Sequence, residues 1–147
     1  MSLDAGLFKQ IMARWASGVS VVTTMVNNEP HGMTASSFAS VSLNPMLVLV
    51  NVGKQQHTHS RIEQSGSFAV NILREDQAEW GKLFAGMLPD RAKQFIDIPY
   101  TTAVTGSPIL PESSGWLDCK VYRAYEGGDH TIFVGEVVAG NIAQSPE

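Results

Sequence analysis

Short β-branched segments separated by turn-forming residues dominate this chain and restrict the folds that it can adopt. The segment VSVVTTMV, residues 19–26, is interrupted by NNEP, whose asparagines and proline favour a tight turn. The extended, serine-rich sequence HGMTASSFASVSLNP follows at residues 31–45. This order predicts a β-hairpin early in the chain.

Three further regions carry a strand pattern. Residues 46–52 and 67–73 are short apolar runs containing several valines, which is typical of buried strands. Residues 116–140 predict two long strands joined at the glycine-rich sequence EGGD, residues 126–129. Roughly six strands are therefore expected, most of them connected by short turns.

The first predicted helix lies near the N-terminus. Asp4 is the expected N-cap, and Gly18 is where the helix is expected to end. Between them, apolar residues fall on a single helix face. They are Leu7, Phe8, Ile11, Met12 and Trp15.

Two shorter helices are predicted between and after the later strands. The polar sequence after residue 52 predicts one or two helical turns that start near Thr58. Asp76 and Glu79 have the spacing of a capping box, and Gly86 is expected to stop that helix. Residues 87–106 form the one long stretch without a regular pattern.

The fold class that these elements predict is α+β, mainly β. Turns rather than crossover helices connect the strands, so an antiparallel barrel with peripheral helices is favoured over a doubly wound parallel sheet. A chain of 147 residues can bury one core, so residues 1–147 are expected to form a single domain.

The composition limits the possible partners. Charged residues make up only 16% of the chain, which leaves little polar material to cover a monomer and favours a homo-oligomer. A net charge of -4 with scattered lysines and arginines argues against nucleic acid. The longest apolar run, residues 46–50, is too short to span a membrane. A single cysteine and no signal-peptide pattern lead us to expect a cytoplasmic protein.

Common catalytic motifs are missing from the sequence. It contains neither a Rossmann nor a P-loop phosphate fingerprint, and Ser37 is not part of a nucleophile elbow. His57 and His59 lack nearby cysteine or carboxylate ligands, so we interpret them as part of a solvated polar turn and expect no metal. Cys119 lies in an alternating strand, where a buried apolar role is favoured over that of a nucleophile.

Three features remain as candidates, and each has a plain structural alternative. The serines of residues 36–42 form either a ligand-binding surface or the solvent side of a strand. Lys54 with Thr58 is either an anion site or a solvated loop. Asp129 and His130 are either functional groups or ordinary turn residues.

Taken together, these elements resemble the flavin reductase family of FMN-binding split barrels. The resemblance runs from FKQIMARWASGVSVVTT through HGMTASSFASVSLNPMLVLVNV and SFAVNIL to GGDHTIFVGEVV. It implies an antiparallel Greek-key split β-barrel with peripheral helices. The implied activity is NAD(P)H-dependent reduction of FMN or FAD, which supplies reduced flavin to a partner monooxygenase. The resemblance also implies a homodimer with flavin bound between the subunits.

The resemblance assigns candidate cofactor residues. Those that border the isoalloxazine ring are Met33, Thr34, Ala35, Ser36, Ser37, Asn51, Val52 and Gly53. The ring carries several polar atoms along one edge, so it requires small side chains and close backbone amides. Lys54, Thr58 and the amides that open the following helical turn are assigned to the phosphate. Arg91 is assigned a further contact to phosphate or nucleotide.

His130 is the catalytic residue that the resemblance implies, close to the nicotinamide or the flavin edge. Hydride transfer from nicotinamide C4 to flavin N5 needs no protein acid or base for the hydride itself, so a missing catalytic triad is expected. The alternative function is that of a non-catalytic FMN-binding electron-transfer flavoprotein. A purely structural barrel is a third interpretation, which leaves the serines unexplained.

Several residues differ from the family pattern. Gln56 replaces a serine often found two residues before the position of Thr58, and Met46 replaces the second proline of a pair. The segment around Arg91 is stretched over residues 90–95. The sequence stops at VVAGNIAQSPE, where members of the family usually continue into a further strand or tail.

Overall fold

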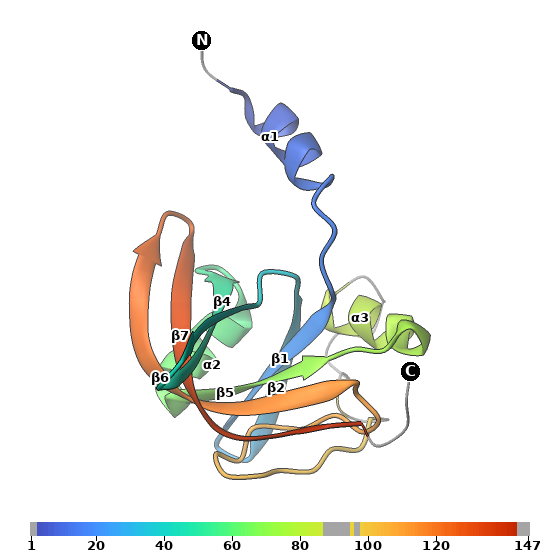
Figure 1. Cartoon of the computed structure of the whole chain (residues 1–147), viewed down its shortest axis with the longest axis vertical. Coiled ribbons are helices and arrows are strands. Elements are labelled where there is room, and N and C mark those ends of the chain that lie inside the picture. The colour runs from blue at the N-terminus through green and yellow to red at the C-terminus, as the bar shows by residue number, and fades with distance from the viewer. Residues whose placement is uncertain (1–2, 87–94, 96–97, 144–147) are drawn as a thin grey trace.

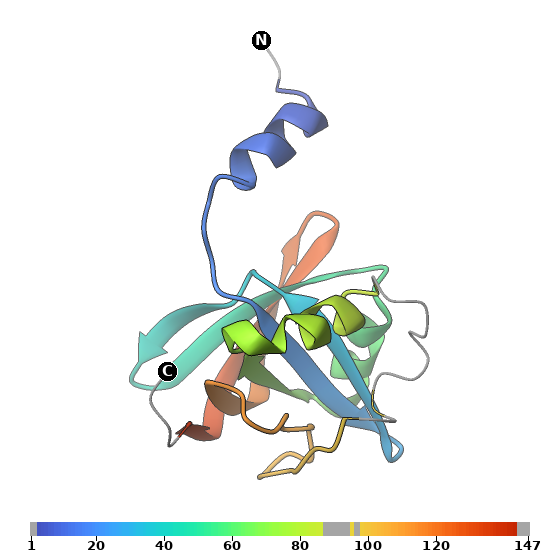
Figure 2. The same cartoon turned by 90° about the vertical axis from the view of Figure 1, so that its right-hand side faces the viewer.

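Seven antiparallel strands form one curved sheet in a computed structural model that describes residues 3–86, 95 and 98–143. The strand order is β2-β1-β5-β6-β7-β4-β3, and the sheet curls around its core in Figures 1 and 2. The strands are β1 (Ser20–Val26), β2 (Glu29–Ala35), β3 (Ala39–Leu43), β4 (Met46–Gly53), β5 (Ser67–Ile72), β6 (Gly115–Gly127) and β7 (His130–Ile142). Within the described residues, the end strands β2 and β3 do not pair with each other, so the barrel is split. The predicted α+β, mainly β class is confirmed.

Both predicted hairpins are confirmed. Strands β1 and β2 meet at Asn27 and Asn28, whose positive φ angles of 52° and 63° suit a two-residue turn. Strands β6 and β7 meet at Gly128, with a φ of 72°, and Asp129. The serine-rich stretch is two strands rather than one, because β3 pairs with β4 instead of with β1.

In the described ranges, four helical segments accompany the sheet: α1 (Ala5–Met12), α2 (His57–Ser65), the 3-10 turn η1 (Glu75–Gln77) and α3 (Ala78–Phe84). None of the helices in the described part of the chain is long and apolar enough to cross a bilayer. Figure 2 shows α3 packed on the sheet and α1 projecting away from it.

Helix α1 begins as predicted and ends early. The Asp4 carboxylate accepts a hydrogen bond from the backbone N–H of Leu7 at 2.7 Å, which makes Asp4 the N-cap. The predicted end at Gly18 is wrong, since the helix stops at Met12. No residue of α1 is buried in the single chain, so tertiary packing does not stabilise further turns.

The predicted capping box of Asp76 and Glu79 is also wrong. The backbone N–H of Arg74 donates to Gln77 Oε1 at 2.8 Å instead, and the Gln77 amide donates to the carbonyl of Pro111 at 3.0 Å. Gln77 is buried, and the turn that it ends, η1, is 3-10 rather than α-helical. The predicted stop is correct, because Gly86 follows α3 with a φ of 76°.

The barrel core is formed by alternate side chains of β1, β4, β5 and β7. Val22, Val50, Phe68 and Phe133 are each at most 2% exposed and pack in one cluster. Gly135 lies over this cluster, since a Cβ atom added there would lie 2.6 Å from Phe68 Cζ. The tight packing fixes the strands whose ends carry the candidate site.

Candidate active site

The connection between β2 and β3 is fastened to β4 by one serine. Ser37 Oγ donates to the carbonyl of Asn51 at 3.2 Å and accepts from the N–H of Asn51 at 3.1 Å. Ser36, its neighbour, is exposed and lies outside the paired strands. Ser37 thus holds the turn against β4, and the exposed Ser36 leaves one face of the turn open.

The end of β4 lies beside the start of β7. Gly53 is paired with His130, and Asn51 is paired with Ile132. A Cβ atom added to Gly53 would lie 3.7 Å from His130 Nε2, so the imidazole lies close to the backbone of β4. Because side chains alternate along a strand, Asn51 and Gly53 face the same side of the sheet, opposite to the buried Val52.

The imidazole of His130 is held by its neighbour in sequence. Its Nδ1 lies 2.7 Å from Asp129 Oδ1, within hydrogen-bonding distance. This hydrogen bond, together with the charge of a protonated imidazole, lowers the pKa of the Asp129 carboxyl. The carboxylate therefore stays ionised and orients the ring.

A second ion pair connects the same hairpin to β4. Lys54 Nζ lies 2.6 Å from Glu126 Oε2, and the backbone N–H of Lys54 donates to the carbonyl of Asp129 at 2.9 Å. The hydrogen bond from Lys54 and its charge lower the pKa of Glu126. Sequence reasoning missed Glu126 because it is 72 residues away from Lys54 and no local pattern relates the two.

Helix α2 begins at His57, shortly after this lysine. Its N-cap residue, Gln56, makes no side-chain hydrogen bond to the helix, which leaves backbone N–H groups at the first turn for another acceptor. Thr58 lies in that turn, but its side chain is buried, with 4% exposed. Lys54 follows the end of β4 and precedes the N-terminus of α2 by a few residues, so two groups that favour anions lie close together along the chain.

Other predicted site residues lie with their side chains away from this surface. Met33, Ala35 and Val52 pack in or against the barrel core, so they can contribute only through their backbone. Thr34 Oγ1 donates to the carbonyl of Gly81 in α3 at 2.6 Å. Arg91 lies outside the described residues. The residues that the structure does bring together are Ser36, Ser37, Asn51, Gly53, Lys54 and His130.

The carboxamide of Asn51 provides a test of whether a flavin ring fits. Its Oδ1 atom is buried and has no hydrogen-bond partner among the described residues. Buried acceptors are nearly always paired in folded proteins, so such an atom indicates a missing donor. The imide N3–H of isoalloxazine is a donor of the required kind, and a flat ring suits the small side chains nearby. The residues present fit the group.

The side chain of His59 is less exposed than predicted. It lies in α2, where its side chain is 12% exposed, its Nε2 is 2.7 Å from Thr131 Oγ1 and its Nδ1 is 3.4 Å from Glu63. The interpretation of this histidine as part of a solvated turn is therefore wrong, because the start of β7 covers it. No group of three or more metal-binding side chains occurs in the described ranges.

Cys119 has the buried apolar role predicted for it. The residue is 0% exposed, and burial raises the pKa of its thiol to about 12. The thiol is therefore protonated and inert at neutral pH.

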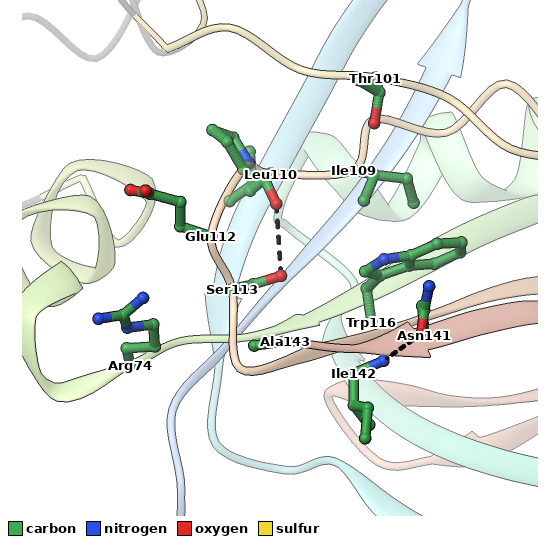
Figure 3. Close-up of a pocket in the computed structure, with 11 residues that line it drawn as sticks. Arg74, Thr101, Ile109, Leu110, Glu112, Ser113, Trp116, Asn141, Ile142 and Ala143 are labelled. Atoms are coloured by element: carbon green, nitrogen blue, oxygen red, sulfur yellow. Dashed lines mark hydrogen bonds between the residues drawn. The ribbon is translucent and has the colours of Figure 1, made fainter. Parts of the chain in front are cut away.

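A separate cavity of about 330 Å³ lies at the other end of β7 (Figure 3). Trp116 of β6 and Asn141 of β7 form one wall, and Leu110 and Ser113 of the preceding loop form another. Among the candidate residues that the structure describes, none lines this cavity. The candidate site belongs instead to the end of the barrel where β7 starts.

Comparisons with known proteins identify the family of this chain. Residues 12–147 match the model of the flavin reductase like domain. The chain is 40% identical over 137 residues to an "NADH-dependent FAD reductase" of Streptomyces globisporus, covering 92% of this chain and 75% of that protein. It is 35% identical over 136 residues to "Flavin-dependent monooxygenase, reductase subunit HsaB" of Rhodococcus jostii, covering 92% and 68%.

Solved structures show the same architecture. "Flavin reductase PheA2 in native state" matches with a TM-score of 0.90 and 39% identity, over 97% of this chain and 90% of that one. The NADH:FAD oxidoreductase SgcE6 of Streptomyces globisporus, in complex with NAD and FAD fragments, matches with a TM-score of 0.89 and 36% identity, over 100% and 90%. The fold is that of the split-barrel flavin oxidoreductases. The chain belongs to the flavin reductase like domain family.

Proposed function

We propose that this chain is an NAD(P)H-dependent flavin reductase that passes its reduced flavin to a partner monooxygenase. Family membership and the names of its relatives support this activity. The observation that carries it is the buried Asn51 Oδ1, which has no partner within the described part of the chain. It lies beside the Ser37 turn, on the strand whose end adjoins His130.

The isoalloxazine ring is proposed to lie against the turn after β2 and the outer face of β4. Ser36 and Ser37 border the ring through their backbone and hydroxyl groups, and Asn51 and Gly53 do so from β4. Met33, Thr34, Ala35 and Val52 contribute only main-chain atoms, because their side chains are used in packing or bonded elsewhere.

The flavin phosphate is proposed to lie at the N-terminus of α2. Lys54 supplies an ammonium group, and the amides of the first turn, including that of Thr58, supply donors. FMN has one such phosphate, and FAD places its diphosphate in the same position. Arg91 is proposed as an additional contact.

Bound flavin supplies the hydride acceptor, its N5 atom, for the nicotinamide C4 hydride. The chain contributes position and exclusion of water rather than acid or base chemistry. His130, oriented by Asp129, lies where its Nε2 can accept a hydrogen bond from the amide group of the nicotinamide or, in the protonated ring, donate one to the flavin edge.

The protein is proposed to act as a homodimer. Helix α1 leaves the sheet with apolar residues exposed: Phe8 is 54% exposed and Ile11 51%, and Trp15, which follows the helix, is 75% exposed. Leu43 at the end of β3 is 85% exposed. Apolar surface of this extent favours burial against a second copy. Light scattering during gel filtration is expected to give the mass of a dimer, and Phe8→Ser is expected to weaken it.

The proposed compartment is the cytoplasm. Cells keep their pools of NADH and NADPH there, and a flavin monooxygenase needs its reductase in the same compartment. The single, buried thiol of Cys119 is consistent with a protein that uses no disulfide.

One assay tests the activity. Purified protein is mixed with NADH or NADPH and with free FMN or FAD, and the nicotinamide absorbance is followed. Oxidation that increases with added flavin is the expected result, and the four combinations identify the preferred pair. A protein that binds flavin but leaves both nucleotides intact would be the electron-transfer flavoprotein instead.

A further inference from the structure

The cation proposed for the flavin phosphate already has an acidic partner in this chain. Lys54 Nζ lies 2.6 Å from the carboxylate of Glu126, which is 83% exposed. A phosphate that approaches Lys54 therefore competes with this carboxylate for the same ammonium group.

We infer that Glu126 competes with the flavin phosphate for Lys54 and thereby keeps bound flavin exchangeable. This competition rests on the proposed function, because it concerns the same phosphate site. Glu126 is then the residue that sets the affinity for phosphate-bearing flavins. A reductase that hands its product to another protein needs such weak retention, whereas a carrier with a permanent prosthetic group does not.

Backbone contacts hold both members of the pair in place. Glu126 is in β6, paired with Thr131 of β7, next to the Gly127–His130 pair that closes the hairpin. The backbone of Lys54 is bonded to the carbonyl of Asp129 in the same hairpin at 2.9 Å. Glu126 therefore stays near Lys54 whether or not the two side chains touch.

The charges favour displacement by phosphate. Ion pairs between exposed side chains contribute little free energy, and the Lys54 side chain is 37% exposed, so an incoming anion can reach it. A phosphate monoester carries more negative charge than a carboxylate at neutral pH and offers three acceptor oxygens. After displacement, the Glu126 carboxylate remains as a like charge beside the phosphate and weakens its binding.

Glu126→Gln tests this competition, since glutamine keeps the shape and removes the charge. Dissociation constants for FMN, FAD and riboflavin are measured by quenching of flavin fluorescence. Riboflavin lacks the phosphate and therefore reports on the ring alone. The control is Glu75→Gln, which removes the same charge from an exposed position on η1.

The expected result is a gain in affinity of about 3- to 10-fold for FMN and FAD, with riboflavin unchanged. The dissociation rate of FMN is expected to fall by a similar factor, and Glu75→Gln is expected to change none of these values. In a Lys54→Gln background, the gain from Glu126→Gln is expected to shrink, because there is no longer a cation to compete for.

Two results would overturn the inference while leaving the proposed function intact. One is an equal gain for all three flavins, which would place Glu126 near the ring or in the fold. The other is flavin binding that Glu126→Gln does not alter. Failure of the wild-type protein to bind any flavin would overturn the proposed function itself and this inference with it.

Discussion

The imidazole Nδ1 of His130 lies 2.7 Å from Oδ1 of Asp129, its immediate neighbour in sequence, in the turn that joins β6 and β7. The carboxylate holds one ring nitrogen and leaves Nε2 directed toward the end of β4, near Gly53. Because Nδ1 carries the hydrogen that it donates to the carboxylate, Nε2 of the neutral ring is a hydrogen-bond acceptor, and it becomes a donor only when the ring is protonated.

His130→Ala is therefore expected to slow the reduction of bound flavin by NADH or NADPH by roughly 10- to 100-fold, because one positioned hydrogen bond is lost. Flavin binding is expected to remain. Anaerobic stopped-flow mixing measures the single-turnover rate. Asp129→Asn, which leaves the imidazole present, is expected to cause a smaller loss. An unchanged single-turnover rate for His130→Ala would remove this residue from the reaction.

Asn51→Leu is expected to separate stability from function. Leucine has a similar size and removes a buried acceptor that finds no partner among the described residues, so the flavin-free protein is expected to gain about 1 kcal/mol in free energy of unfolding. Flavin affinity is expected to fall about 10-fold, since the donor on the ring loses its acceptor. Urea unfolding and fluorescence titration measure the two effects. Equal flavin affinity in both proteins would place the ring away from Asn51.

Gly135→Ala is expected to destabilise the barrel. A Cβ atom at this position would lie 2.6 Å from Phe68 Cζ and 2.8 Å from Cys119 Cβ, inside the tightly packed core. Overpacking of this kind costs about 1–3 kcal/mol, which urea unfolding measures. Gly18→Ala is the control, because a Cβ atom there would meet nothing within 4 Å. Similar unfolding midpoints for the two variants would argue against the described packing of β7.

The stability of the protein is expected to fall in acid partly through His31. Burial and the nearby Arg61 guanidinium lower the pKa of His31, with a smaller contribution from His57 and an opposing one from Glu29. His31 Nε2 also accepts a hydrogen bond from Arg61 Nε at 3.3 Å, which requires the neutral ring. Below the ordinary histidine pKa of 6.5, the unfolded chain binds a proton that the folded protein resists, so stability decreases as pH falls.

His31→Gln is accordingly expected to lose less stability than the wild type between about pH 7.5 and about pH 5.5, a range that spans the histidine pKa. Urea midpoints at both values measure the difference. An identical pH dependence in the wild type and His31→Gln would exclude this histidine as a source of acid sensitivity.

Local patterns in the sequence were sufficient for most elements. Asn27 and Asn28 favour the positive φ angles of a tight hairpin turn, and Gly128 does the same in the second hairpin, so both turns are predictable. Asp4 and Gly86 likewise mark the ends of helices by chemistry within a few residues. The capping-box prediction failed because a residue distant in sequence takes part. The Gln77 amide donates to the carbonyl of Pro111, and this contact rather than Asp76 shapes the turn before α3.

Neighbouring residues were enough to specify the class of fold, the family and the residue types of the candidate site, since turn propensities, apolar alternation and short motifs are local. Which of those residues meet depends on the packed fold. It paired Lys54 with Glu126, joined Ser37 to the backbone of Asn51 and left the Asn51 oxygen without a partner among the residues described. Such contacts depend on strand register across the sheet, and register is set by the packing of the whole core rather than by any one segment.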